Sequence, residues 1–164
     1  MASFGLAAAL LIGPGWDSSV ILALAFGAYA IVDAAGNLVF VRGARGFDTT
    51  AYLGRAGLGL VAGALTLAHP TLTTTALFLV VSVWGIGTGV LEILFGSRAW
   101  TTVPRPVGFM IEGMLSFGLG VSAIHFALES PAMLRGFLVA YAVANGIAAT
   151  ALGESLHPPV RQAA

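Results

Sequence analysis

Five long apolar stretches divide the chain, and they constrain its fold more than any other feature. A helix of about 20 apolar residues is long enough to cross the hydrocarbon core of a bilayer. Turn-rich pieces that contain glycine or proline separate the stretches. The pattern predicts an all-α integral membrane protein with five spanning segments. These segments are Val20–Val41, Tyr52–Ala68, Thr74–Phe95, Val107–Ala127 and Met133–Leu152.

A shorter apolar segment, Ala2–Ile12, precedes them. At about 1.5 Å per residue it reaches about half-way across a bilayer. No Lys or Arg precedes it, so it lacks the basic region expected before the core of a signal peptide. We expect a short, tilted or re-entrant first helix, which brings the number of membrane segments to six. A cleaved signal peptide and a start codon further upstream are the alternatives.

The charge content excludes several classes of protein. Only 9% of the 164 residues are charged and 58% are hydrophobic, whereas a soluble domain carries about 25% charged residues. A net charge of zero provides no attraction to nucleic acid. Cysteine is absent, which excludes disulfides and thiolate metal sites. The sequence has no phosphate-binding loop, nucleophile elbow or paired-histidine motif, so we expect no enzyme, cofactor or metal.

The distribution of arginine predicts the orientation. The chain has no lysine, and six of its seven basic residues fall on one side of the predicted bundle. Because cytoplasmic loops carry an excess of Lys and Arg, we expect that side to be cytoplasmic, with both termini (N-in, C-in). Residues 1–152 then form one helical-bundle domain, and residues 153–164 form a cytoplasmic tail. The six arginines are Arg42, Arg45, Arg55, Arg98, Arg105 and Arg161.

Internal similarity indicates three copies of one helical hairpin. Each outer turn carries a proline, and the helix after it has an aromatic residue followed, four positions later, by a polar one. We expect parallel repeats at about residues 1–41, 52–95 and 107–152, around an axis near the membrane normal. The aromatic and polar pairs are Tyr29 and Asp33, Trp84 and Thr88, and Tyr141 and Asn145. The helices before the prolines also correspond, with Arg55-Ala56-Gly57-Leu58-Gly59 matching Glu112-Gly113-Met114-Leu115-Ser116.

The middle repeat resembles a known family. Its first helix begins with Arg55 and continues through small residues to His69-Pro70, and its second contains Val83-Trp84-Gly85-Ile86-Gly87-Thr88-Gly89-Val90. This order is similar to the short repeat of HdeD-type acid-resistance membrane proteins. The resemblance implies a non-catalytic, six-span protein of the bacterial inner membrane, linked in some members to survival at low pH. The chain departs from the pattern in its short first segment and in Glu112, which occupies the position of Arg55.

Four polar residues are expected at a similar depth inside the membrane: Asp33, Thr88, Glu112 and Asn145. Two interpretations stay open. The residues either join helices by hydrogen bonds worth about 0.6 kcal/mol each, or they form a proton- or cation-responsive site titrated by Asp33 and Glu112. We expect Arg55 either to form an ion pair with Glu112 or to extend to the interface.

Two further expectations concern helix positions. Glu92 lies near the end of its apolar stretch, so it is predicted to be interfacial and solvated. Gly59 and Gly63 on one helix, and Gly85 and Gly89 on the next, place small residues on one face. Such faces allow backbones to approach closely in lipid. The three histidines fall on opposite sides of the membrane and cannot bind a metal ion together.

Three functions are consistent with these features. The first is a non-catalytic HdeD-type protein of acid or envelope stress. The second is an accessory subunit of a larger inner-membrane complex, because the loops are small and the glycine faces suit contact with a partner. The third is a small proton or ion channel or transporter that uses Asp33 and Glu112. The expected partners are the lipid bilayer and either further copies of the chain or other membrane-protein subunits.

Overall fold

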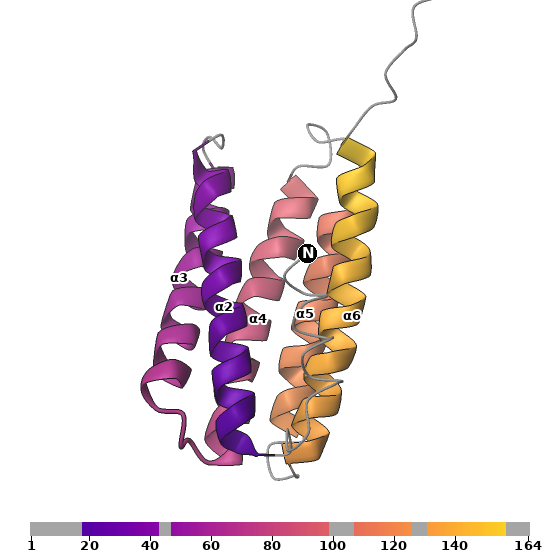
Figure 1. Cartoon of the computed structure of the whole chain (residues 1–164). Coiled ribbons are helices and arrows are strands. Elements are labelled where there is room, and N and C mark those ends of the chain that lie inside the picture. Colours follow the sequence, from indigo (N-terminus) through magenta and orange to yellow (C-terminus); the bar gives the residue numbers. More distant parts are fainter. Residues whose placement is uncertain (1–17, 43–46, 99–106, 126–130, 157–164) are drawn as a thin grey trace, which may run out of the picture.

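The computed structural model describes residues 18–42, 47–98, 107–125 and 131–156. Within these ranges every secondary-structure element is an α-helix, and the helices lie side by side, running alternately in opposite directions (Figure 1). A helix suits these apolar stretches because it pairs its own backbone groups, which lipid cannot do. The helices are α2 (Ser19–Val41), α3 (Phe47–Ala68), α4 (Thr74–Arg98), α5 (Val107–His125) and α6 (Pro131–Leu156).

The all-α, multi-pass membrane prediction is confirmed for the described residues. Four segments are long and apolar enough to cross a membrane, and a shorter apolar helix covers Ala132–Ile147. The expected first segment, Ala2–Ile12, lies outside the described residues, so the sixth segment stays a prediction, as does the orientation. The four long segments are Ser19–Val41, Thr49–Ala68, Thr74–Arg98 and Gly108–His125.

The helices extend beyond the predicted stretches at one end of the bundle. Phe47 rather than Tyr52 begins α3, α4 continues to Arg98, and α6 continues to Leu156, into the predicted tail. Hydropathy detects only the apolar part of a helix, whereas backbone hydrogen bonding continues through polar residues at the interface. We call this end of the bundle, the top in Figure 1, the arginine end, because Arg42 and Arg98 lie there. The opposite end is the proline end.

Glycine produces two close helix interfaces, α2 with α3 and α4 with α5, which are the most extensive contacts in the bundle. A Cβ atom added to Gly59 on α3 would lie 2.8 Å from the carbonyl oxygen of Ala30. One added to Gly85 on α4 would lie 2.9 Å from the carbonyl oxygen of Ser116. The backbones are therefore too close for any larger residue.

The two interfaces also use corresponding contacts. A Cβ added to Gly63 would lie 2.7 Å from Cγ1 of Ile31, and one added to Gly120 would lie 2.7 Å from Cγ1 of Ile86. In the alignment of the predicted repeats, Gly63 matches Gly120 and Ile31 matches Ile86. The same kind of helix pair is thus built twice. Each tight pair joins the second helix of one predicted hairpin to the first helix of the next.

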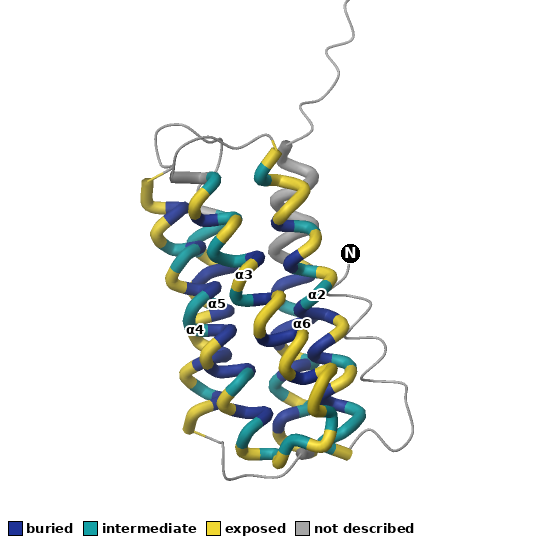
Figure 2. The backbone as a smooth tube through the Cα atoms, turned by 90° about the vertical axis from the view of Figure 1, so that its left-hand side faces the viewer, coloured by how far each residue is buried: buried dark blue, intermediate teal, exposed yellow. Residues whose placement is uncertain are grey.

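The outer faces of the bundle are apolar. Figure 2 shows exposed residues along the outside of every helix and buried residues along the inside. Val61, Val83 and Met114 are each at least 65% exposed. A surface of this kind is unfavourable in water and suits contact with lipid chains.

Candidate functional site: a buried arginine and carboxyl cluster

Four charged residues from four helices gather inside the bundle, toward the arginine end. Arg55 comes from α3, Asp33 from α2, Glu92 from α4 and Glu112 from α5. We call this group the Arg55 cluster. Asp33 and Glu112 are thus brought together, as members of one electrostatic group around a single guanidinium.

Arg55 holds the cluster together. Its Nη2 atom lies 2.6 Å from Oε1 of Glu92 and 3.9 Å from Oδ1 of Asp33. The side chain of Glu92 is 2% exposed and that of Arg55 is 15% exposed. A charged side chain in the membrane interior is unfavourable unless it is paired, and a short guanidinium–carboxylate contact is a strong form of pairing. The pair therefore links α3 to α4 and, more loosely, to α2.

Both carboxyl groups that pair with Arg55 have a second donor. The hydroxyl of Ser116 donates to Oε2 of Glu92 at 3.2 Å, and Nδ2 of Asn37 donates to Oδ2 of Asp33 at 3.2 Å. Among the described residues, no side chain forms an ion pair or hydrogen bond with Glu112, although it is 9% exposed and attracted by the charge of Arg55. Among the three carboxyl groups of the cluster, that of Glu112 thus has the fewest polar contacts within the described residues.

The expectation for Glu92 was wrong, and Arg55 pairs differently from the prediction. Glu92 is buried, because it lies two turns after Trp84 on the inner face of α4, and α4 continues to Arg98. Arg55 forms its ion pairs with Glu92 and Asp33 in place of the expected Glu112. Arg55 is also too buried to extend to the interface. The alignment of the repeats could have indicated that Glu92 is buried, since Glu92 aligns with Asn37, another buried polar residue.

The remaining polar residues of the predicted layer, Thr88 and Asn145, form hydrogen bonds outside these ion pairs. The hydroxyl of Thr88 donates to the carbonyl oxygen of Trp84 in its own helix at 2.8 Å. Nδ2 of Asn145 on α6 donates to the hydroxyl of Tyr29 on α2 at 3.4 Å. Asn145 therefore joins two helices, whereas the hydrogen bond of Thr88 satisfies its hydroxyl locally.

A hydrogen-bonded chain leads from the cluster to the centre of the bundle. The hydroxyl of Ser116, which contacts Glu92, also lies 3.1 Å from the hydroxyl of Tyr141 on α6. The sequence analysis predicted neither Ser116 nor Tyr141 as a member of a polar site. Both are fully or almost fully buried, so the hydrogen bonds satisfy groups that lipid and the apolar core cannot.

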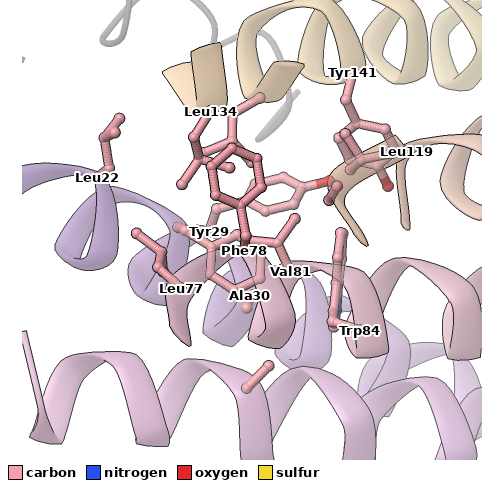
Figure 3. Close-up of a cluster of buried hydrophobic side chains, with 14 of the residues drawn as sticks. Leu22, Tyr29, Ala30, Leu77, Phe78, Val81, Trp84, Leu119, Leu134 and Tyr141 are labelled. Atoms are coloured by element: carbon pink, nitrogen blue, oxygen red, sulfur yellow. The ribbon is translucent and has the colours of Figure 1, made fainter. Parts of the chain in front are cut away.

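Three aromatic residues meet where this chain ends. Tyr29, Trp84 and Tyr141, the aromatic residues at matching positions of the predicted repeats, contact one another edge to face (Figure 3). Their ring centroids are 5.8 Å apart for Tyr29 and Trp84, 5.7 Å for Trp84 and Tyr141, and 6.5 Å for Tyr29 and Tyr141. We call these residues the central triad. Three helices thus contribute equivalent side chains to one contact, as parallel repeats around an axis require.

The cluster is enclosed on both sides. Toward the proline end, the central triad adjoins a core of buried apolar side chains, several of which Figure 3 shows. The buried hydroxyls described in that half, those of Thr66 and Ser82, donate to carbonyl oxygens of their own helices. Toward the arginine end, three aromatic side chains adjoin Arg55 and Glu92: Tyr52, Phe95 and Phe109. The described side chains therefore offer no continuous polar path along the bundle.

In chemical terms the cluster can hold charge and exchange protons. The guanidinium of Arg55, which stays protonated at any ordinary pH, pairs with two carboxyl groups and attracts a third, that of Glu112. Among the described residues, His, Asp and Glu side chains form no group of three or more that is arranged to hold a metal ion. The site is thus an arginine and carboxyl network whose net charge depends on protons.

The comparison with known families matches the middle part of the chain. Residues 54–125 match the family described as a short repeat of unknown function (DUF308), which includes HdeD-type membrane proteins. The DUF308 segment runs from within α3 to the end of α5 and contains Arg55, Glu92, Glu112 and Ser116. No curated protein and no solved structure matches the chain.

Proposed function

We propose that the chain is a non-catalytic protein of the bacterial inner membrane that acts in acid or envelope stress. The observation that carries this proposal is the Arg55 cluster, in which one buried guanidinium pairs with the carboxyl groups of Glu92 and Asp33 and also attracts that of Glu112. The charge of such a cluster changes when protons bind, and a change of charge inside a bundle alters the balance of forces between its helices. The presence of HdeD-type proteins in the DUF308 family supports the same function.

The proposed topology has six segments, arranged as three hairpins, with both termini in the cytoplasm. Arg42 and Arg98 at the arginine end support a cytoplasmic position for that end. The central triad supports three related hairpins, because each described copy contributes one aromatic residue. Segment Ala2–Ile12 is the proposed first helix of the first hairpin.

The absence of catalysis is also part of the proposal. Two hollows among the described residues, of about 250 and 320 Å³, are grooves between α3 and α4 and between α5 and α6, lined almost entirely by apolar side chains. A substrate site usually has several polar groups that converge on a pocket. In the Arg55 cluster, the charged groups are directed toward one another.

An accessory subunit of a membrane complex is the second candidate. Gly57, Gly118 and Gly136 have open space where a Cβ atom would lie, so the backbone of a neighbouring helix can approach there. A second copy of the chain or another membrane protein can supply that helix. A proton or ion channel that uses Asp33 and Glu112 ranks third, because apolar side chains fill the half of the bundle beyond the central triad.

The test is survival of acid by a deletion strain that is complemented with variants of equal membrane abundance. We expect the deletion to lower survival and the wild-type chain to restore it. The triple variant Asp33→Asn, Glu92→Gln, Glu112→Gln is expected not to restore it, because its cluster cannot take up protons. Glu154→Gln, in the predicted tail, is the matched control and is expected to restore survival. Equal survival of the deletion and parent strains contradicts the proposal.

A further inference from the structure

Among the described helices, α6 has no counterpart of the two tight pairs. Each tight pair joins the second helix of one predicted hairpin to the first helix of the next, α2 to α3 and α4 to α5. In the predicted repeats, α6 is the second helix of the third hairpin. Its Tyr141 meets Tyr29 and Trp84 in the central triad, so α6 holds the place around the axis that α2 and α4 hold. By the same geometry, a first helix belongs beside α6.

The face of α2 that contacts α3 and the face of α4 that contacts α5 recur on α6. Each face consists of four positions that match in the alignment of the repeats, and in α2 and α4 these positions lie against the partner helix. On α6, Ala142 and Gly146 are buried and Val139 and Val143 are partly buried. We call these four residues the α6 face. The matching positions are Gly27, Ala30, Ile31 and Ala34 on α2, Ser82, Gly85, Ile86 and Gly89 on α4, and Val139, Ala142, Val143 and Gly146 on α6.

The described neighbours of α6 lie on its other sides. Ala140 borders the groove between α5 and α6. It lies about 200° around the helix from Ala142, because each residue turns an α-helix by about 100°. Tyr29 of α2 contacts Tyr141 and Asn145, on the inner side of α6. Neither α5 nor α2 therefore accounts for the burial of the α6 face.

We propose that segment Ala2–Ile12 packs against the α6 face and forms a third tight pair, which closes the three hairpins into a ring. The segment belongs to residues 1–17, the longest part of the chain outside the described residues. At about 1.5 Å per residue it is about 16 Å long as a helix, which is enough to span Val139–Gly146. Both α2 and α6 begin at the proline end (Figure 1). The residues that precede α2 therefore enter the bundle at the end where α6 begins.

The prolines of the first two repeats give the register of this pair. Ala7 and Gly63 each lie seven positions before the proline that follows the first helix. Gly63 lies against Ile31 in the α2–α3 pair, and Ile31 matches Val143. We therefore expect Ala7 to contact Val143, and alanine is small enough for a close approach. A Cβ atom on Gly63 would lie 2.7 Å from Cγ1 of Ile31, which is bonded to Cβ. Cysteines at such positions are close enough for a disulfide, whose Cβ atoms are about 3.5–4.5 Å apart.

A closed ring limits where a partner can bind. The α6 face is then occupied within the chain, so a second copy or another subunit has to use outward-facing glycines such as Gly57 and Gly118. The inference uses the first helix of the proposed topology and does not depend on a role in stress.

The test is disulfide formation in the full chain in lipid bilayers. The chain has no cysteine, so two introduced thiols report a single contact. Under mild oxidation, Ala7→Cys, Val143→Cys is expected to form a disulfide within one chain at least about tenfold faster than the control Ala7→Cys, Ala140→Cys. Ala140 lies on the groove side of α6. Maleimide labelling and mass spectrometry count the free thiols, and denaturing gels detect cross-links between chains.

A second pair of cysteines makes the result independent of how one variant folds. Counted from the same prolines, Leu10 matches Thr66, which lies against Gly27, and Gly27 matches Val139. Leu10→Cys, Val139→Cys is therefore expected to form a disulfide as well. A disulfide within one chain in either pair, at a rate well above that of the control, supports the ring.

Three results overturn the ring. The first is cross-linking between chains in place of cross-linking within one chain, which assigns the α6 face to a second copy. The second is an equal rate in the control. The third is absence of a disulfide from both pairs in chains that keep the helix content and unfolding midpoint of the wild type. Acid survival is not measured in this experiment, so failure of the ring and failure of the proposed function are separate results.

Discussion

The α2–α3 and α4–α5 pairs share their packing but differ in the polar residues that they carry inward. Both use glycine against backbone, with Gly63 and Gly120 in matching contacts. At matching inner positions, however, α2 and α3 carry Asp33, Asn37, Arg55 and Gly59, whereas α4 and α5 carry Thr88, Glu92, Glu112 and Ser116. The repeated scaffold thus supplies the shape, and its polar positions vary independently of it. The Arg55 cluster exists only because one pair contributes the cation and the other contributes two carboxyl groups.

The largest loss of stability is expected from a change in the ion pair that joins the α2–α3 pair to the α4–α5 pair. Arg55→Met removes the cation and leaves Glu92 buried without its charge partner. Breaking a buried ion pair in this way destabilises a protein by about 3–5 kcal/mol. The measurement is unfolding in mixed detergent micelles. If Arg55→Met, Glu92→Gln is more stable than Arg55→Met alone, the loss comes from the uncompensated carboxylate; equal stability contradicts this explanation.

The close approach of α4 and α5 is tested by giving α4 the residue that α2 carries at the matching position. Gly89 matches Ala34 of α2, but a Cβ atom on Gly89 would lie 2.6 Å from the carbonyl oxygen of Gly113 and would collide with the backbone of Phe117. Gly89→Ala is therefore expected to destabilise the bundle by about 1–3 kcal/mol. Gly118→Ala, which meets open space, is the control, with an expected change within about 0.5 kcal/mol. Equal effects of the two variants would show that the α4–α5 contact is looser than described.

The serine that distinguishes α5 from α3 is expected to have a smaller effect. Ser116→Gly copies the matching residue, Gly59, and removes the hydroxyl that lies between Glu92 and Tyr141. We expect a loss of about 1–2 kcal/mol, because two buried oxygens lose a hydrogen bond. The same unfolding measurement serves here. Ser82→Ala, whose hydroxyl bonds only its own helix, is the comparison, and a larger loss for Ser82→Ala would contradict this account of Ser116.

The smallest effect is expected at Thr88, which replaces Asp33 in the second pair. Its hydroxyl bonds the carbonyl oxygen of Trp84 in the same helix, so Thr88→Val removes no contact between helices. We expect a change of no more than about 0.6 kcal/mol, the average for a single hydrogen bond in a membrane bundle. A loss as large as that of Ser116→Gly would place Thr88 in the inner network after all.

The sequence predicts the helices well, because a helix depends on residues close in the chain. The apolar stretches locate α2 to α6 to within a few residues, and Asp33 and Glu112 do lie beside the same arginine. The contacts between side chains of neighbouring helices are harder to predict. The sequence places Glu92 at the interface because the apolar stretch ends near it. It pairs Arg55 with Glu112, because no feature of the sequence indicates which helices face each other.

The pairing of Arg55 is the central claim, and a ¹³C–¹⁵N distance measurement in lipid tests it directly. Solid-state NMR of the labelled chain can detect dipolar contacts between the guanidinium nitrogens of Arg55 and the side-chain carboxyl carbons of glutamate. We predict a strong contact from Arg55 that disappears in Glu92→Gln and persists in Glu112→Gln. A contact that persists in Glu92→Gln and disappears in Glu112→Gln would contradict the arrangement of the cluster.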